Sequence, residues 1–224
     1  MYKVIGIDEA GKGPVIGSMF IGFAVINLEK KEDLESYQKH LKELGVRDSK
    51  LIAPKKRNEI FETIKNEMDI KYAQLTPSLI DNNFFGGGKL NELEIRSIIH
   101  VLEQEKPQLF IIDALTADPK KFGNSIKKRL SFECDFVSEN KADSKYEIVG
   151  AASIIAKELR EKEIKEIKEK IGIDCGSGYP ADPKTKKFLQ ENFQSKEFDF
   201  IFRKSWKTYQ KHVKSKFQKT LDEF

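Results

Sequence analysis

Residues 4–17 read Val-Ile-Gly-Ile-Asp-Glu-Ala-Gly-Lys-Gly-Pro-Val-Ile-Gly, and this segment decides how the rest of the chain is interpreted. An apolar run, short enough to be a buried strand, ends in the adjacent acids Asp8 and Glu9 and then breaks into a glycine-rich turn. At a strand end that turns, both carboxylates can converge on one cation, and Gly11 and Gly13 leave backbone amides accessible to a phosphate. A polar turn that closes a hairpin explains the same residues equally well. The rest of the sequence has to decide between a site and a turn.

Length and composition indicate one main domain. The chain has 224 residues, enough for one hydrophobic core, and no linker rich in Ser, Gly or Pro divides it. We expect a main domain at 1–200, followed by a basic helix and tail at 201–224. No apolar run approaches the roughly 18 residues of a membrane span, and no signal-peptide pattern is present. Cys134 and Cys175 lack metal-ligand spacing. These features predict a soluble cytoplasmic protein with reduced thiols.

The charges of the chain are unevenly distributed. The formal net charge is only +4, from 40 basic and 36 acidic residues. The segment 201–224, however, contains two acids, Asp222 and Glu223, against the bases Arg203, Lys204, Lys207, Lys211, Lys214, Lys216 and Lys219. A basic end of this kind indicates a polyanionic partner, although a solvated helix face has the same composition.

Apolar periodicity predicts strands that alternate with helices after an opening hairpin. Strands are expected at 4–7, 16–27, 70–75, 109–112 and 133–138. Helices are expected at 30–45, 54–68, 77–85, 90–105, 144–170, 183–192 and 201–217, with one more after Asp118-Pro119. Thr76-Pro77, Asp118-Pro119 and Asp182-Pro183 each have the cap-then-proline pattern of a helix start. The helix at 144–170 begins with a capping box of Ser144 and Glu147, and its apolar first half is expected to lie across the sheet. This order gives an α/β domain with a mixed central sheet.

Two further acids occupy positions like those of Asp8 and Glu9. Asp113 ends the apolar strand at 109–112, and Asp143 precedes the longest helix. Sites in open α/β sheets form at the carboxyl ends of strands, so the four acids are expected to meet. Clustered carboxylates repel unless a pKa rises or cations bind, and oxygen ligands alone select Mg²⁺ or Mn²⁺, the ions used for in-line attack on phosphodiesters. Taken singly, Asp113 also suits a turn and Asp143 a helix N-terminus.

Two aromatic residues lie where nucleic acid could contact them. Tyr179 follows Gly-Ser-Gly, which leaves its ring accessible for stacking on a base or sugar, although packing explains it too. Arg203 is close to the only tryptophan, Trp206. That pair suits a nucleic-acid groove as well as a helix-to-core anchor.

Seven motifs together resemble ribonuclease HII, most closely its archaeal form. They are Gly-Ile-Asp-Glu-Ala-Gly-Lys-Gly-Pro-Val-Ile-Gly (6–17), Asp-Ser-Lys (48–50), Leu-Asn-Glu-Leu-Glu (90–94), Lys-Ala-Asp-Ser-Lys-Tyr (141–146), Ala-Ala-Ser-Ile-Ile-Ala-Lys (151–157), Gly-Ser-Gly-Tyr-Pro (176–180) and Ser-Trp-Lys-Thr (205–208). The resemblance implies a ribonuclease H-like mixed sheet flanked by helices, with additional C-terminal helices. It also implies an endonuclease that cleaves the RNA strand of RNA/DNA hybrids and cuts at single ribonucleotides in duplex DNA, leaving 5′-phosphate and 3′-hydroxyl ends.

The resemblance also implies roles for individual residues. The family's four catalytic metal ligands, which hold two Mg²⁺ or Mn²⁺ ions, match Asp8, Glu9, Asp113 and Asp143. Gly11, Lys12 and Gly13 match the family's loop that contacts the 2′-hydroxyl of the scissile ribonucleotide. Tyr179 matches the family's tyrosine that recognises the RNA-to-DNA junction. Further substrate contacts are expected at Asp48, Ser49, Lys50, Lys145, Arg203 and Ser205.

The chain departs from the family pattern at two positions. Lys12 stands where the family usually has arginine, so a bidentate contact is replaced by a point charge, whereas contacts made by the backbone are kept. Asn140 stands where archaeal members commonly have histidine, so a supporting role for histidine is missing.

The last seven residues predict a protein partner. Gln218, Leu221 and Phe224 resemble the motif by which replication and repair enzymes dock on the sliding clamp, although a frayed tail is the alternative. We expect a monomer that has no membrane contact. Two other functions stay open from the residues alone: a junction resolvase-like DNA nuclease and a non-catalytic hybrid-binding module.

Overall fold

The computed structural model describes residues 1–46, 49, 52–114 and 116–222, with side chains up to residue 214. The chain forms two compact units. The first comprises Met1–Ala10, Phe20–Ala73 and Glu94–Leu159, and the second comprises Gly11–Met19, Gln74–Leu93 and Arg160–Phe224. The expected boundary at residue 200 stays a prediction.

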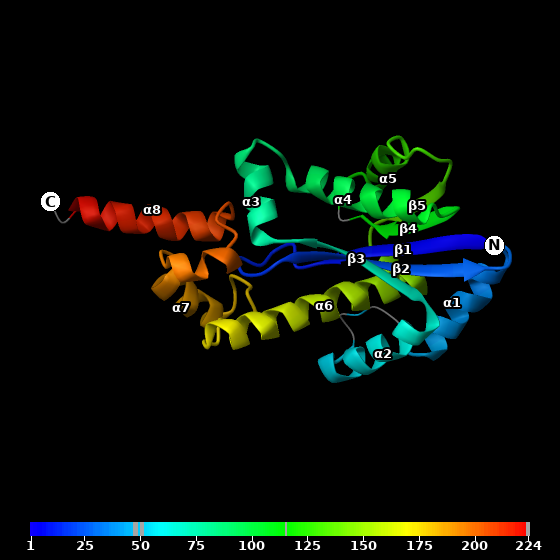
Figure 1. The fold of residues 1–224 in the computed structure, drawn as a ribbon, viewed down its shortest axis with the longest axis horizontal. Coiled ribbons are helices and arrows are strands. Elements are labelled where there is room, and N and C mark those ends of the chain that lie inside the picture. The colour runs from blue at the N-terminus through cyan, green and yellow to red at the C-terminus, as the bar shows by residue number, and fades with distance from the viewer. Residues whose placement is uncertain (47–48, 50–51, 115, 223–224) are drawn as a thin grey trace. The chain divides into compact units, whose positions relative to one another are not determined.

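The strands and helices alternate as expected (Figure 1). The strands in the described part of the chain are β1 (Tyr2–Ala10), β2 (Met19–Leu28), β3 (Asp69–Leu75), β4 (Leu109–Asp113) and β5 (Asp135–Glu139). The α-helices there are α1 (Asp33–Glu43), α2 (Pro54–Glu67), α3 (Pro77–Phe85), α4 (Leu90–Glu105), α5 (Pro119–Lys127), α6 (Glu147–Ile171), α7 (Pro183–Asn192) and α8 (Lys207–Asp222). Two 3-10 turns are η2 (Ala142–Ser144) and η3 (Lys196–Ile201).

The five strands form one mixed sheet in the order β3-β2-β1-β4-β5. β1 pairs antiparallel with β2 and parallel with β4, and β4 pairs parallel with β5. The opening hairpin and the α/β class with a mixed sheet are therefore confirmed. Because β1 and β4 run in the same direction, their carboxyl ends lie at the same edge of the sheet.

Helix α6 approaches the sheet closely because two strand positions lack side chains. A Cβ atom at Gly6 would lie 2.2 Å from the carbonyl oxygen of Ile148, and one at Gly22 would lie 2.4 Å from that of Ala152. Only glycine permits such a close approach of two backbones. The first half of α6 therefore lies across the sheet, as its apolar composition predicted, and it runs beneath the strands in Figure 1.

The core of the first unit lies largely between α6 and the sheet. The buried residues of this cluster include Ala24, Ile26 and Ile111 from the strands and Ile148, Ala152 and Ile155 from α6. On β4 and β5, Phe110 and Phe136 stack with their ring centroids 5.7 Å apart. Since β-branched and aromatic side chains pack well on a pleated surface, these residues support the strands that carry the site.

The second unit has an aromatic core of its own. Buried phenylalanines from α7, η3 and the segment after η3 pack with Tyr209 of α8 and with Ile164 and Ile167 of α6. Residues 15–17 join this core through the backbone, because the Arg203 N–H donates to the Val15 carbonyl and the Gly17 N–H donates to the Ile201 carbonyl, both at 2.9 Å. The glycine-rich turn therefore begins a segment that is anchored to the C-terminal region.

Three helix starts follow the predicted capping chemistry. The side chains of Thr76, Asp118 and Asp182 accept hydrogen bonds from the first-turn amides of α3, α5 and α7, and a proline follows each cap.

Two predicted helix starts are wrong. The capping box at Ser144 does not form, since Ser144 belongs to η2, donates its hydroxyl to the Lys141 carbonyl, and α6 begins at Glu147. The last helix begins at Lys207 rather than at residue 201, because Ile201 ends η3 and Arg203 pairs with Val15.

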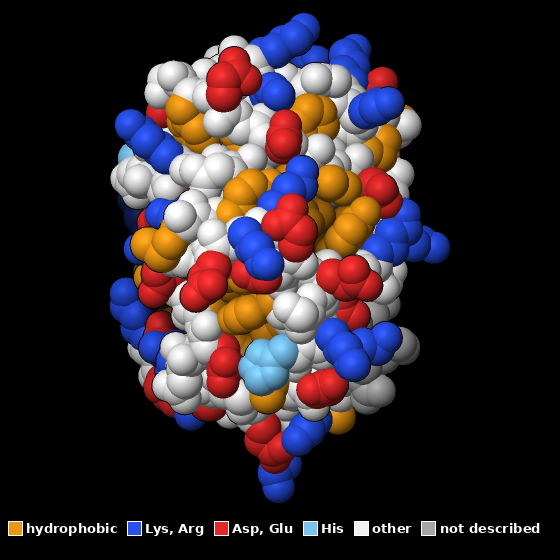
Figure 2. Space-filling model, turned by 90° about the vertical axis from the view of Figure 1, so that its right-hand side faces the viewer, with side chains coloured by type: hydrophobic (Ala, Val, Ile, Leu, Met, Phe, Trp, Pro, Cys, Tyr) orange, Lys and Arg blue, Asp and Glu red, His pale blue; other side chains and the backbone are white. Residues whose placement is uncertain are grey.

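The surface is highly charged, and on the face in Figure 2 basic and acidic side chains are interspersed. Among the described residues, no helix combines the length and apolar character needed to cross a membrane.

Candidate active site

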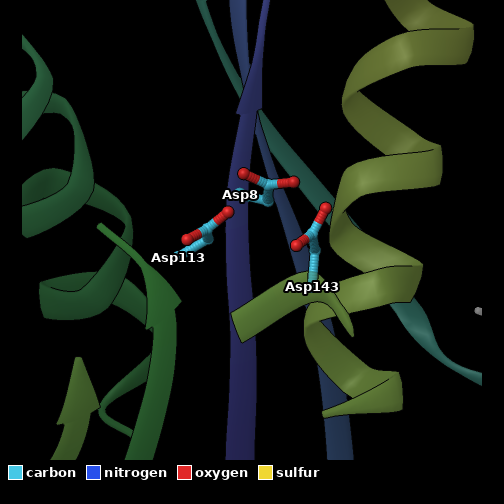
Figure 3. A group of neighbouring side chains, drawn as sticks. All are labelled: Asp8, Asp113 and Asp143. Atoms are coloured by element: carbon cyan, nitrogen blue, oxygen red, sulfur yellow. The ribbon is translucent and has the colours of Figure 1, made fainter. Parts of the chain in front are cut away.

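Three aspartates converge at one edge of the sheet. Asp8 lies in β1 and Asp113 at the end of the neighbouring parallel strand β4, where Ile7 pairs with Ile112. Asp143 lies in η2, just before α6. Each residue contributes one carboxylate oxygen to a group in which all such oxygens lie within 4.8 Å of one another, and all three side chains are buried (Figure 3). The sequence prediction that these acids meet is confirmed for these three.

Burial and mutual repulsion make ionisation of this cluster unfavourable. The pKa of Asp8 is raised well above its ordinary value, chiefly by burial, then by the charge of Glu9 and also by that of Asp113. Hydrogen bonds from the Ser153 hydroxyl and the Glu9 amide act in the opposite direction and lower that pKa. The amide bond to Asp8 Oδ1 measures 2.8 Å. The site therefore favours either a bound proton or a bound cation.

The donor set fits a hard divalent cation. Buried carboxylate oxygens without histidine or thiolate partners are the ligands that Mg²⁺ and Mn²⁺ prefer. A cation among these oxygens would replace the repulsion between them by attraction. The three aspartates can therefore hold a divalent metal.

Glu9 differs from the other predicted ligand residues. Strand β1 continues to Ala10, so Asp8 and Glu9 lie inside the strand and not at its end, where both carboxylates were expected to converge. Consecutive strand residues direct their side chains to opposite faces. Within the described residues, the 4.8 Å group contains Asp8, Asp113 and Asp143 without Glu9. The role of Glu9 as a metal ligand stays a prediction.

The second unit brings together the predicted loop and the predicted tyrosine. A Cβ atom at Gly13 would lie 3.7 Å from the Tyr179 ring, and Gly11 has φ +85°, a conformation that suits glycine. The Tyr179 side chain remains accessible to solvent, and the Arg160 guanidinium lies over its ring, 4.6 Å from the centroid. Arg160 also donates to the Ser177 carbonyl. The ring is thus held in place while the residue stays partly exposed.

Arg203 is buried completely and fixes the backbone of the same loop. Its Nε donates to the Gly17 carbonyl at 2.8 Å and its Nη1 to the Lys12 carbonyl at 3.3 Å. Burial, followed by the charge of Arg160, lowers the pKa of Arg203 to about 10. Trp206 contacts its guanidinium, 5.0 Å from the ring centroid. In this structure Arg203 supports the loop from within, which corresponds to the anchor alternative of the sequence analysis.

The other predicted substrate residues have protein partners or lie outside the described part of the chain. Lys145 forms an ion pair with Glu139. Ser205 donates its hydroxyl to Asp81 at 2.6 Å, and Ser49 is buried. Asp48, Lys50 and Phe224 lie outside the described residues, as do the side chains of Gln218 and Leu221.

Two contacting residues were missed by the sequence analysis. Ser153, which hydrogen-bonds Asp8, is a hydroxyl residue within the apolar run 148–156. A hydroxyl group buried by such a run needs a hydrogen-bond partner inside the protein, so its presence there could have indicated a contact with another polar residue. Arg160 lies in the amphipathic half of α6, where it does not differ from the solvated charges around it.

Comparison with known proteins identifies the family. The model of the ribonuclease HII family matches residues 5–209. The chain belongs to the ribonuclease HII family. It is accordingly a ribonuclease H, an endonuclease that acts on RNA/DNA hybrids, as the resemblance implied.

Full-length relatives agree with this assignment. The ribonuclease HII of Pyrococcus horikoshii is 42% identical over 229 residues, which cover 99% of each chain. The crystal structure of the ribonuclease H2 from Pyrococcus horikoshii OT3 superimposes with a TM-score of 0.83 at 41% identity, covering 95% of this chain and 98% of that one. The ribonuclease HII in a complex with PCNA from Archaeoglobus fulgidus gives a TM-score of 0.80 at 33% identity, covering 91% and 95%.

Proposed function

We propose that Asp8, Glu9, Asp113 and Asp143 form the catalytic centre of this ribonuclease and bind two divalent ions, Mg²⁺ or Mn²⁺. The observation that carries the proposal is the buried group of three aspartates at the edge of the sheet. When bound, the metal ions supply Lewis-acid activation of water and stabilisation of the leaving 3′-oxygen. The products are 5′-phosphate and 3′-hydroxyl ends.

The chain's own residues contribute ligand position and charge. Asp8 and Asp113 are fixed by paired strands, and the Ala142 N–H, at 3.4 Å, donates to Asp113 Oδ1. Fixed carboxylates need little reorganisation when a cation binds, and such preorganisation is a main source of electrostatic catalysis. Their burial keeps water from weakening that interaction.

We propose that Gly11, Lys12, Gly13 and Tyr179 read the ribonucleotide. Gly13 lies beside the Tyr179 ring. Arg203 restricts the Lys12 backbone because its guanidinium donates a hydrogen bond to the Lys12 carbonyl. A loop held in this way can present amides to a 2′-hydroxyl whether residue 12 is lysine or arginine. The accessible ring is suited to stacking on the neighbouring sugar or base.

The test is cleavage of a duplex DNA that contains one ribonucleotide. We expect cuts 5′ of the ribonucleotide in Mg²⁺ or Mn²⁺, none after chelation, and none in the same duplex made entirely of DNA. Cleavage of a four-way DNA junction in preference to this duplex would favour a resolvase-like nuclease. Binding without cleavage in either metal would favour a non-catalytic hybrid-binding module.

We further propose that the C-terminal tail docks on a sliding clamp through Gln218, Leu221 and Phe224. The similar Archaeoglobus fulgidus protein forms a complex with PCNA. The backbone of α8 extends to Asp222, so Gln218 and Leu221 are in helical backbone. Leucine and an aromatic residue three positions later are suitable anchors for an apolar groove.

A further inference from the structure

A line of buried hydroxyl groups connects a lysine of α6 to the aspartate cluster. Lys157 donates from Nζ to the Ser49 hydroxyl. The Ser49 and Ser153 hydroxyl oxygens lie 2.8 Å apart, and the Ser153 hydroxyl hydrogen-bonds the Asp8 carboxylate. All four residues belong to the first unit. The line joins the segment between α1 and α2, helix α6 and strand β1.

When Asp8 is ionised, the chemistry of the two end groups fixes the direction of every hydrogen bond in this line. An ammonium group can only donate, and an ionised carboxylate can only accept. Each serine hydroxyl has a single proton to donate. Ser153 uses its proton on Asp8, so the hydrogen bond between the serines must be donated by Ser49. Ser49 in turn accepts from Lys157, and every donor in the line is directed toward Asp8.

Burial makes these bonds difficult to replace. Ser153 is 0% and Ser49 is 1% exposed, so water cannot take the place of a lost partner. Hydrogen bonds in such surroundings strengthen one another, and an orphaned buried group is costly. The arrangement therefore favours one orientation of the Asp8 carboxylate in its ionised form.

The backbone places the donors with little freedom. Gly22 pairs with Asp8 across β1 and β2, and a Cβ at Gly22 would collide with Ala152, the residue before Ser153. Ser153 and Lys157 are four residues apart and therefore share one face of α6. Glu158, the residue after Lys157, forms a buried ion pair with Arg57 of α2, in which Arg57 Nε lies 2.6 Å from Glu158 Oε1. This pair fastens α2 to α6 close to the Lys157 end of the line.

We propose that Lys157, Ser49 and Ser153 are positioning residues that orient the Asp8 carboxylate for binding a divalent cation. The inference rests on the proposed function, in which Asp8 is a metal ligand. Ser49 then acts through Asp8 and not by touching the nucleic acid, which was its expected role. Groups that orient metal ligands typically change metal affinity about 10- to 100-fold when removed.

Calorimetric titration with Mn²⁺, without nucleic acid, tests this directly. We expect Ser153→Ala and Ser49→Ala to bind Mn²⁺ about 10- to 100-fold more weakly than the unmodified chain. Ser138→Ala is the matched control, because Ser138 is a buried serine of the same unit whose hydroxyl donates to the Pro119 carbonyl at 2.7 Å. Its Mn²⁺ affinity should equal that of the unmodified chain, and thermal unfolding should show that all variants fold.

Cleavage kinetics add a measurement that general destabilisation would not move. At limiting metal, Ser153→Ala and Ser49→Ala should lower kcat and leave the KM for hybrid unchanged, and raising the Mn²⁺ concentration should restore the rate. If Ser153→Ala fails to fold, Ser49→Ala and Lys157→Met carry the test, since Lys157→Met keeps the stem and removes the donor.

The outcomes separate this inference from the proposed function. Absence of Mn²⁺ binding by the unmodified chain would contradict the proposed metal site itself. Normal Mn²⁺ binding by the unmodified chain together with unchanged affinity in the serine variants would overturn the positioning role alone. A raised KM for hybrid in Ser49→Ala, with unchanged Mn²⁺ affinity, would instead place Ser49 among the substrate contacts.

Discussion

Asp8 is subject to two opposing requirements. Its carboxylate must be ionised to bind a metal, but burial and the charges of Glu9 and Asp113 raise its pKa. The Ser153 hydroxyl and the Glu9 amide oppose that rise without cancelling it. In the metal-free protein, ionisation of Asp8 is therefore unfavourable, and a cation bound at the proposed metal site would relieve the repulsion.

The stability of the metal-free protein should consequently depend on pH through Asp8. As pH rises from about 4, the unfolded chain loses this proton before the folded chain does, so the free energy of unfolding falls up to the raised pKa. Asp8→Asn has no such proton, and we expect it to melt at a higher temperature than the unmodified chain near neutral pH. Each kcal/mol of relieved repulsion should correspond to about 2–4 °C.

Scanning calorimetry across this pH range, with and without Mg²⁺, measures the effect. Mg²⁺ should raise the melting temperature of the unmodified chain, more at higher pH, because it binds the ionised carboxylates. Mg²⁺ should raise the melting temperature of Asp8→Asn by a smaller amount. Identical melting curves for both proteins at every pH would show that ionisation of Asp8 does not destabilise the folded chain, and would contradict this prediction.

Single residues could be predicted where sequence position fixes their surroundings. Asp113 follows a buried strand, and its arrival at the site follows from the parallel pairing of β1 and β4. Ser153 and Arg160 could not be predicted in the same way, because their partners Asp8 and Tyr179 are distant in sequence. Only the folded chain shows which internal group a buried polar side chain meets.

At the scale of elements, the contact between α6 and the hairpin sets the geometry of the site. Gly6 and Gly22 lie on the same sheet face as Asp8, since Gly6 is two residues before it and Gly22 is its cross-strand partner. Both allow the α6 backbone to approach without a side chain between. Ser153 reaches Asp8 only because the helix is this close.

Gly22→Ala should push α6 away from the sheet. The added methyl group would lie 2.4 Å from the Ala152 carbonyl oxygen, so we expect a loss of about 1–3 kcal/mol in unfolding free energy. We also expect weaker Mn²⁺ binding, because Ser153 moves with the helix. Chemical denaturation and calorimetric titration measure the two effects.

Gly172→Ala is the control for this substitution. It lies just after α6, where a Cβ would meet nothing within 4 Å, although its φ of +67° disfavours alanine. A moderate loss of stability with normal Mn²⁺ affinity is expected there. If Gly22→Ala also kept normal Mn²⁺ affinity, close packing of α6 would not be what positions Ser153.

The ends of elements were predictable where local chemistry decides them. Thr76, Asp118 and Asp182 cap their helices through amides two or three residues away. Ser144 also has a local capping pattern, with Glu147 three residues later, yet the chain there forms η2, which places Asp143 in the aspartate group. A tertiary requirement of the site has overridden the capping box.

At the scale of the whole molecule, the alternation of strands and helices was sufficient to predict the α/β class and the mixed sheet. The division into two compact units was not predictable, because each unit is assembled from three separate segments. Composition indicated no linker between them. The net charge of +4 is likewise uninformative, since opposite charges are interspersed on the face in Figure 2 while bases collect toward the C-terminus.

Removal of residues 218–224 should separate catalysis from clamp docking. We expect the shortened chain to cleave free duplex at the rate of the full chain and to lose association with the sliding clamp of its own organism, measured by surface plasmon resonance. The double variant Leu221→Ala/Phe224→Ala should behave like the deletion. The matched variant Lys219→Ala/Thr220→Ala should still bind, and clamp binding by the shortened chain would refute the proposed motif.

The most direct test of the aspartate centre is the rate at which Asp8→Asn cleaves a duplex with a single ribonucleotide, measured beside its affinity for the same duplex. The substitution preserves size and removes one ligand charge. If the aspartates form the catalytic centre, cleavage should fall to background in Mg²⁺ and in Mn²⁺ while duplex affinity stays largely intact. Substantial Mn²⁺-dependent cleavage by Asp8→Asn would contradict this assignment.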